Sequence, residues 1–164
     1  MEGLGTTLRK LIDALDGGVQ AHYDAIGLDF RPRFYPVARQ LQAGRALSIR
    51  ALANATGVSH SAVSQTVAEM RSAGLVTGAP GQDGRERLIE LTATGLDACA
   101  RLQALWDAIA RAAATLDAEL PIPLTDILRE TAARLEAEDF ASRIAHQLVP
   151  GALAGSLSSD PLAV

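Results

Sequence analysis

Residues 59–65 bring together several side chains that can donate and accept hydrogen bonds. Serine hydroxyls can do both, and a glutamine amide can form two parallel hydrogen bonds with the edge of an adenine base. If this segment opens a helix, its first backbone N–H groups also favour a nearby phosphate. The residue types therefore indicate recognition through hydrogen bonds. The residues concerned are Ser59, His60, Ser61, Ser64 and Gln65.

Two short helices are predicted to position this polar set. Ser48 can cap a helix over residues 49–56, and Ser59 can cap a second helix that runs to about Ala73. Gly57 lies between them and tolerates the positive φ that a tight turn requires. The spacing is that of a helix-turn-helix, in which the first two turns of the second helix reach base edges. Small or apolar residues are expected to hold the two helices together and against the core: Leu52, Ala53, Val58, Val63, Val67 and Met70.

A β-hairpin is predicted after the second helix. Leu75–Val76 and residues 87–91 have the short apolar pattern of strands, and the turn-forming residues 78–84 separate them. Helical periodicity extends over Thr6–Ile26, from Pro32 or Arg33 to Gly44, from Thr92 to about Leu120, and from Leu124 to Leu148 with a phase shift near Glu138–Asp139. We therefore expect a mainly α fold with a small β-hairpin wing, followed by a flexible tail over residues 150–164.

The predicted helix after Thr92 carries an apolar stripe whose members are three and four residues apart in turn. An average period of 3.5 residues is typical of a helix that packs lengthwise along another helix. The stripe is therefore predicted to be a seam between helices. It consists of Cys99, Leu102, Trp106, Ile109, Ala113, Leu116 and Leu120.

Charge is segregated along the chain. Residues 31–92 contain eight arginines and four acidic residues, a local net charge of +4, whereas the whole chain has a net charge of −4. Affinity for nucleic acid depends on the local basic surface, so the acidic ends do not exclude contact with DNA phosphates. No stretch approaches the roughly 20 apolar residues that span a bilayer, and the N-terminus lacks a signal segment. We expect a soluble, cytoplasmic protein without a membrane partner.

The sequence contains no recognisable catalytic motif. A glycine-rich phosphate loop, a nucleophile elbow and a histidine–carboxylate cluster are all missing. The three histidines have no acidic or cysteine partners at ligand spacing, so neither a metal site nor a cofactor is expected. Cys99 is the single cysteine, which excludes an intrachain disulfide.

The motifs of the central segment resemble those of the MarR family of transcription regulators. The resemblance is specific from about Leu47 to Gly95, and a narrower likeness in residues 28–34 and 60–65 is to the regulator half of proteins that fuse such a domain to an N-acetyltransferase domain. The motifs follow the order and spacing of the family: Leu52-Ala53, Gly57-Val58-Ser59, Ala62-Val63-Ser64-Gln65, Gly74-Leu75-Val76, Asp83-Gly84-Arg85 and Leu91-Thr92-Ala93-Thr94-Gly95.

The resemblance implies a winged helix-turn-helix with a helical dimerisation domain. Residues 29–92 would form the DNA-binding region, and residues 1–28 and 93–149 would form the dimerisation region. Two subunits would bind a pseudo-palindromic operator in double-stranded DNA and regulate transcription.

Positions carried over from the family suggest the DNA contacts. Ser61, Ser64 and Gln65 would face the major groove, beside the helix start at Ser59 and His60. On the wing, Arg85 would enter the minor groove, Asp83 would orient it, and Arg87 would lie near a phosphate. Narrow A·T-rich minor grooves attract inserted arginine. Thr77-Gly78 stand where relatives commonly have a basic residue, and Gln65 stands where arginine is frequent, so binding is expected to be weaker than is typical of the family.

The resemblance also implies a small aromatic or phenolic effector in the crevice between the winged domain and the dimer helices. Occupancy of that crevice would bias the spacing of the two recognition helices. The candidate contacts are His22, Tyr23, Phe34, Tyr35 and Trp106. Two alternatives remain: a winged-helix module that binds a protein, or a partner of a separately encoded acetyltransferase.

Overall fold

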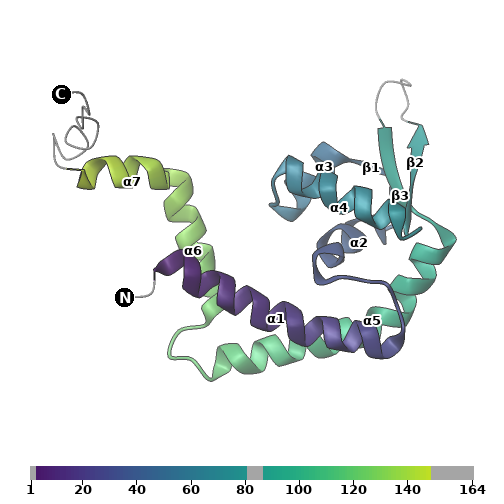
Figure 1. Ribbon diagram of the computed structural model, residues 1–164, viewed down its shortest axis with the longest axis horizontal. Helices are drawn as coiled ribbons and strands as arrows, with labels where there is room; N and C mark the ends of the chain where they lie inside the picture. Colours follow the sequence, from purple (N-terminus) through teal and green to yellow (C-terminus); the bar gives the residue numbers. More distant parts are fainter. Residues whose placement is uncertain (1–2, 81–86, 149–164) are drawn as a thin grey trace, which may run out of the picture. The chain divides into compact units, whose positions relative to one another are not determined.

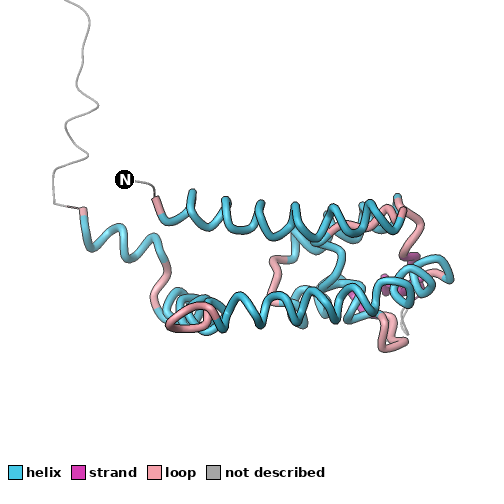
Figure 2. Tube along the Cα trace, turned by 90° about the horizontal axis from the view of Figure 1, so that it is seen from below, coloured by secondary structure: helices cyan, strands magenta, loops and turns pink. Residues whose placement is uncertain are grey.

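The computed structural model of the protein describes residues 3–80 and 87–148, and the chain divides into two compact units, Met1–Ala110 and Arg111–Val164. Helices make up most of the described chain and the strands are short, as Figure 2 shows. The predicted mainly α fold with a small β element is therefore confirmed. The elements of the first unit (Figure 1) are α1 (Leu4–Ile26), the 3-10 helix η1 (Pro32–Phe34), α2 (Tyr35–Leu41), β1 (Leu47–Ser48), α3 (Ile49–Thr56), α4 (His60–Ser72), β2 (Val76–Pro80), β3 (Arg87–Leu91) and the larger part of α5 (Ala93–Ala118).

Local signals in the sequence explain where α3 and α4 begin and end. The side chain of Ser48 accepts a hydrogen bond from the backbone N–H of Ala51, and that of Ser59 accepts one from Ala62, both at 3.3 Å. These caps satisfy N–H groups that have no partner within the helix. Gly57 ends α3 with a φ of 69°, a conformation that residues with a Cβ rarely adopt. The predicted helix-turn-helix is therefore present.

The hairpin is part of a three-stranded antiparallel sheet in the order β1-β3-β2. Val76 pairs with Leu91 and Gly78 with Ile89, so β2 and β3 form the predicted hairpin. Leu47 of β1 pairs with Ile89 on the other side of β3. The two-residue strand β1 escaped the sequence analysis because it is too short to show an alternating pattern.

The core of the first unit joins all of its elements. It combines aromatic residues before α2 with aliphatic residues from the helix-turn-helix, the sheet and α5. Leu52, Val63, Val67 and Met70 are buried as predicted, and Ala53 packs against them. Val58 is 39% exposed, so its predicted core position is wrong. It lies in the turn after Gly57, before α4 sets the direction of the side chains.

The predicted seam on α5 packs partly within the subunit. Cys99, Leu102 and Trp106 are buried in the core of the first unit, whereas Leu116 and Leu120 are exposed. The prediction of one continuous seam between long helices is therefore wrong for the first three residues. Spacing identifies the apolar face of a helix but not the surface against which that face packs.

The second unit contains the end of α5, α6 (Leu124–Ala137) and α7 (Phe140–Gln147). Asp117 accepts a hydrogen bond from the backbone N–H of Leu124 at 2.9 Å and so caps the start of α6, while Asp139 caps α7 through Ser142 at 2.8 Å. A hydrogen bond from the hydroxyl of Thr125 is the main cause that lowers the pKa of Asp117, and the bond from the N–H of Ser142 lowers that of Asp139. The single last helix expected from the sequence is two helices, and they separate at the predicted phase shift. No residue of α6 or α7 is buried.

The start of α5 is fastened to the turn that follows α4. Thr92 donates its hydroxyl to the carbonyl of Gly74 at 2.6 Å and accepts a hydrogen bond from the N–H of Gly95 at 3.0 Å. A Cβ built on Gly95 would lie 2.1 Å from the carbonyl oxygen of Leu75. Only glycine allows this approach without displacement of the backbone.

Replacing Gly95 by alanine is therefore expected to destabilise the protein by about 1–3 kcal/mol, the usual cost of forcing an extra carbon into a packed site. The free energy of unfolding in urea, measured by circular dichroism, tests this. Gly18→Ala in α1 is the matched control, because nothing lies within 4 Å of the new Cβ. The control should gain about 0.5–1 kcal/mol from better helix propensity. Equal stability of the two variants would show that the contact at Gly95 is unimportant.

Candidate nucleic-acid interface

The start of α4 presents polar side chains to solvent. His60, Ser61 and Gln65 are exposed, and Ser64 is half-buried. Ser59 and Ser61 have hydroxyl oxygens 3.3 Å apart, at hydrogen-bonding distance. The opposite face of α4 is anchored by buried residues, which fixes the orientation of the exposed face. The structure thus gathers the five predicted polar residues on one capped helix end.

The turn between α3 and α4 is held by hydrogen bonds as well as by Gly57. The hydroxyl of Thr56 donates to the carbonyl of Leu52 at 2.8 Å and accepts a hydrogen bond from the N–H of Val58 at 3.4 Å. Both bonds restrict the chain where α4 departs from α3. The angle between the two helices is therefore set locally, before any contact with a partner.

The predicted wing residues are only partly described. Arg87 is exposed at the start of β3, where it pairs with Pro80 of β2. Asp83 and Arg85 lie outside the described residues, and so does the predicted tail over residues 150–164.

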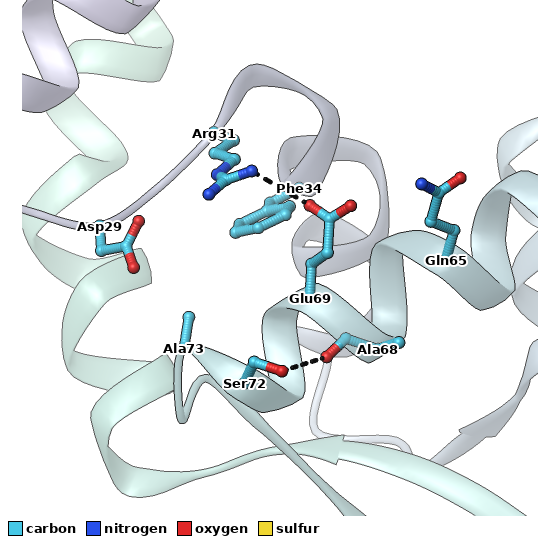
Figure 3. Close-up of a pocket in the computed structure, with 8 residues that line it drawn as sticks. All are labelled: Asp29, Arg31, Phe34, Gln65, Ala68, Glu69, Ser72 and Ala73. Atoms are coloured by element: carbon cyan, nitrogen blue, oxygen red, sulfur yellow. Dashed lines mark hydrogen bonds and ion pairs between the residues drawn. The ribbon is translucent and has the colours of Figure 1, made fainter.

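A pocket of about 420 Å³ opens beside α4 (Figure 3). Gln65 and Glu69 line it from α4, and Arg31 and Phe34 line it from the segment before α2. Both Arg31 and its neighbour Arg33 form ion pairs with Glu69. The sequence analysis missed this cluster because 36 residues separate Arg33 from Glu69, and no local pattern links them.

Four of the five predicted effector contacts lie near one another. Tyr23 and Trp106 are buried and share a hydrogen bond, in which the indole Nε1–H donates to the tyrosine hydroxyl at 3.0 Å. Burial raises the pKa of Tyr23, although the bond from Trp106 opposes this. Phe34 is also buried, and Tyr35 is 38% exposed with its ring 5.1 Å from that of Trp106. His22, the fifth candidate, is exposed on α1.

Phe30, which the sequence analysis did not select, connects the aromatic residues. Its ring lies 5.1 Å from that of Tyr23, 5.6 Å from Phe34 and 5.8 Å from Trp106. Such edge-on and tilted arrangements add to the free energy gained from burial. Tyr23, Phe34 and Trp106 thus form part of a packed core in this state of the protein.

A second pocket, of about 140 Å³, lies between the segment after α1, the turn after α4 and the start of α5. Its wall includes Leu28, Phe30 and Ala98, with Asp97 and Arg101 as charged members. Arg101 donates to the carbonyl of Ile26 at 3.3 Å. Phe30 is the one aromatic residue of the cluster that reaches this pocket.

Residues 3–80 and 87–148 contain no group of three His, Cys, Asp or Glu side chains arranged to hold a metal ion. Over the same residues, no helix combines the length and the apolar character needed to cross a membrane.

Comparisons with known proteins agree with this geometry. Residues 31–86 match the model of the MarR family. No curated protein sequence matches the chain. Among solved structures, the chain is similar to a Mycobacterium tuberculosis transcriptional regulator, MOSR, in complex with DNA, with a TM-score of 0.64 and 23% identity over 83% of this chain and 96% of that one.

Two further structures share the fold. A MarR family transcriptional regulator from Silicibacter pomeroyi matches with a TM-score of 0.57 and 25% identity over 80% of this chain and 94% of that one. The PcaV transcriptional regulator from Streptomyces coelicolor, solved with its natural ligand, matches with a TM-score of 0.56 and 21% identity over 82% of this chain and 92% of that one. The fold of winged-helix MarR regulators thus extends over most of the chain.

The aromatic core allows a test of what Tyr23 does. Tyr23→Phe should lower the free energy of unfolding by about 1–3 kcal/mol, because it leaves the buried Nε1–H of Trp106 without an acceptor. Tyr35→Phe is the control, since the side chain is partly exposed, and it should change stability by less than about 0.5 kcal/mol. Urea titrations followed by tryptophan fluorescence measure both. An unchanged stability of Tyr23→Phe would contradict the structural role of this hydrogen bond.

Proposed function

Because residues 31–86 match the model of the MarR family, we propose that this protein is a sequence-specific DNA-binding transcription regulator, which acts as a homodimer on a pseudo-palindromic operator and is no enzyme. The observation that carries the proposal is the exposed polar start of α4 on a firmly anchored helix-turn-helix. A helix end of this kind reads base edges in the major groove of B-DNA.

The contacts divide into those that read bases and those that hold the backbone. Ser61, Ser64 and Gln65 are the base-reading residues, and Ser59 with His60 lies at the helix start, where N–H groups favour a phosphate. On the wing, Arg85 enters the minor groove, Asp83 orients it, and the exposed Arg87 contacts a phosphate. The concentration of arginines in residues 31–92 supports this division, since the rest of the chain is acidic.

Unpaired apolar faces support the homodimer. Leu11, Ile12 and Leu15 are exposed on α1, and Leu135 and Phe140 are exposed in the second unit. Large apolar patches on soluble proteins mark interaction surfaces, because their exposure to water is costly. Residues 1–28 and 93–149 therefore form the dimerisation region, and residues 29–92 the DNA-binding region.

A small aromatic effector controls the regulator. The ligand-bound PcaV structure, which shares this fold, supports such control. Among the four candidates that lie near one another, Tyr35 has the most accessible ring, and its contact with Trp106 links it to the core. An effector that reaches Tyr23, Phe34 or Trp106 must first displace part of the aromatic packing, which couples its binding to a change of conformation.

Replacing Gln65 by alanine tests the base-reading face. Sites selected by the purified wild-type protein from random duplexes should contain two inverted half-sites. Gln65→Ala should bind the selected site about 1–3 kcal/mol more weakly per lost base contact and should relax the preference at one position of each half-site. Gln103→Ala on α5 is the control and should leave both quantities unchanged. Unaltered preference in Gln65→Ala would mean that another surface reads the DNA.

A charge placed on the apolar face of α6 tests the homodimer. Leu135→Asp should dissociate the protein into subunits at micromolar concentration, as measured by analytical ultracentrifugation, because the buried carboxylate would have no partner. Ala133→Asp introduces the same charge about half a turn away, on the polar face of the helix, and should leave the dimer intact. A monomeric wild-type protein would refute the assembly without bearing on the fold.

A further inference from the structure

Arg31 and Arg33 both bind the side chain of Glu69 on the recognition helix α4. Arg31 Nη1 lies 3.4 Å from Glu69 Oε2, and Arg33 Nη2 donates a hydrogen bond to the same oxygen. Each arginine side chain is still 50% exposed, and that of Glu69 is 27% exposed. Two cations on one carboxylate give the ion cluster itself an excess positive charge, which Asp29 on the wall of the same pocket offsets.

This ion cluster lies next to the base-reading face. Gln65 precedes Glu69 by four residues, so the two share a face of α4 and lie about 6 Å apart along its axis. Figure 3 shows Gln65 one turn along the helix from Glu69, with Arg31 reaching Glu69 from the opposite wall of the pocket. The Arg31 guanidinium also lies 6.0 Å from the centre of the Phe34 ring, which limits where it can swing.

We propose that Arg31 and Arg33 form a binding site for a backbone phosphate of the operator, and that Glu69 occupies this site in the free protein. The inference rests on the proposed function, because it requires α4 to enter the major groove. The groove is about 12 Å wide, so a helix within it has phosphates close to both sides. The planar guanidinium matches phosphate geometry well, and exposed ion pairs contribute little, so a phosphate can replace the carboxylate of Glu69.

DNA suits this site better than a free anion does. Asp29 lines the same pocket as Arg31 and Glu69, and together with Arg33 these residues have no net charge. A small anion from solution therefore gains little attraction. A phosphate of bound DNA is held nearby by the contacts of Gln65, which gives it a high effective concentration.

The test compares the salt dependence of DNA binding by full-length variants on the selected operator. The double variant Arg31→Ala with Arg33→Ala should lower the slope of log affinity against log salt by about 0.9 per subunit, or roughly 2 for the dimer. Its base preference should remain that of the wild type, since a phosphate contact carries no sequence information.

Glu69→Gln provides the second arm, because it removes the competing charge and keeps the size of the side chain. Binding should become several-fold tighter, with a slope at least as steep as that of the wild type. The matched controls are Arg129→Ala and Asp126→Asn, from an exposed ion pair of 2.7 Å on α6, and neither should alter affinity or slope.

Three results would overturn the proposal. They are a wild-type slope in the arginine double variant, weaker binding by Glu69→Gln, and selective competition by inorganic phosphate at constant ionic strength that the double variant abolishes. The last would identify a site for free anions. A wild-type protein that binds no duplex in a salt-dependent, sequence-preferring way would instead refute the proposed function, so the two failures are distinguishable.

Discussion

The packing of Phe30 is the contact on which the arrangement of the first unit depends. Its ring meets Tyr23 of α1, Phe34 of η1 and Trp106 of α5, and so joins α5 to two elements that lie far from it in sequence. The hydrogen bond between Trp106 and Tyr23 closes the same group and leaves no polar atom of either ring unpaired. Arg31 and Arg33 lie in the short segment after Phe30 and contact α4 through Glu69. Helix α4 is thus held in two ways. Its apolar face packs in the core, and its Glu69 is bound by the segment after Phe30, which the aromatic core holds in place.

The polar face of α4 lies on the surface, whereas the aromatic group lies in the interior, and this difference decides which residues tolerate substitution. Ser61, Ser64 and Gln65 can be changed without disturbing the core, because they are exposed or half-buried near a helix start that Ser59 caps. Tyr23, Phe34 and Trp106 cannot, since they fill the space between helices. Under the proposed function, specificity for DNA can therefore vary independently of stability. Any response to an effector at the aromatic residues must act through their packing.

Much of this fold could be predicted from local sequence signals. The caps at Ser48 and Ser59, the turn at Gly57 and the break at Glu138–Asp139 depend on residues close in sequence, so they were visible. Other features depend on contacts between residues far apart in sequence, which a periodic pattern cannot reveal. They are the packing partners of Cys99 and Leu102, the strand β1 and the ion pairs of Glu69. The exposed polar residues of α4 were found because a helix-turn-helix has a fixed geometry. The aromatic candidates were found by type alone, and the structure shows that burial separates Tyr35 from Tyr23, Phe34 and Trp106.

The close contact between Gly95 and the carbonyl of Leu75 has a mechanical consequence. Together with the two hydrogen bonds of Thr92, it joins the end of the recognition helix, the base of the hairpin and the first turn of α5 without an intervening flexible joint. A rotation of the first turn of α5 must then move the base of the hairpin with it. A displacement at the beginning of α5 is therefore passed to the base of the hairpin and to the end of α4 together.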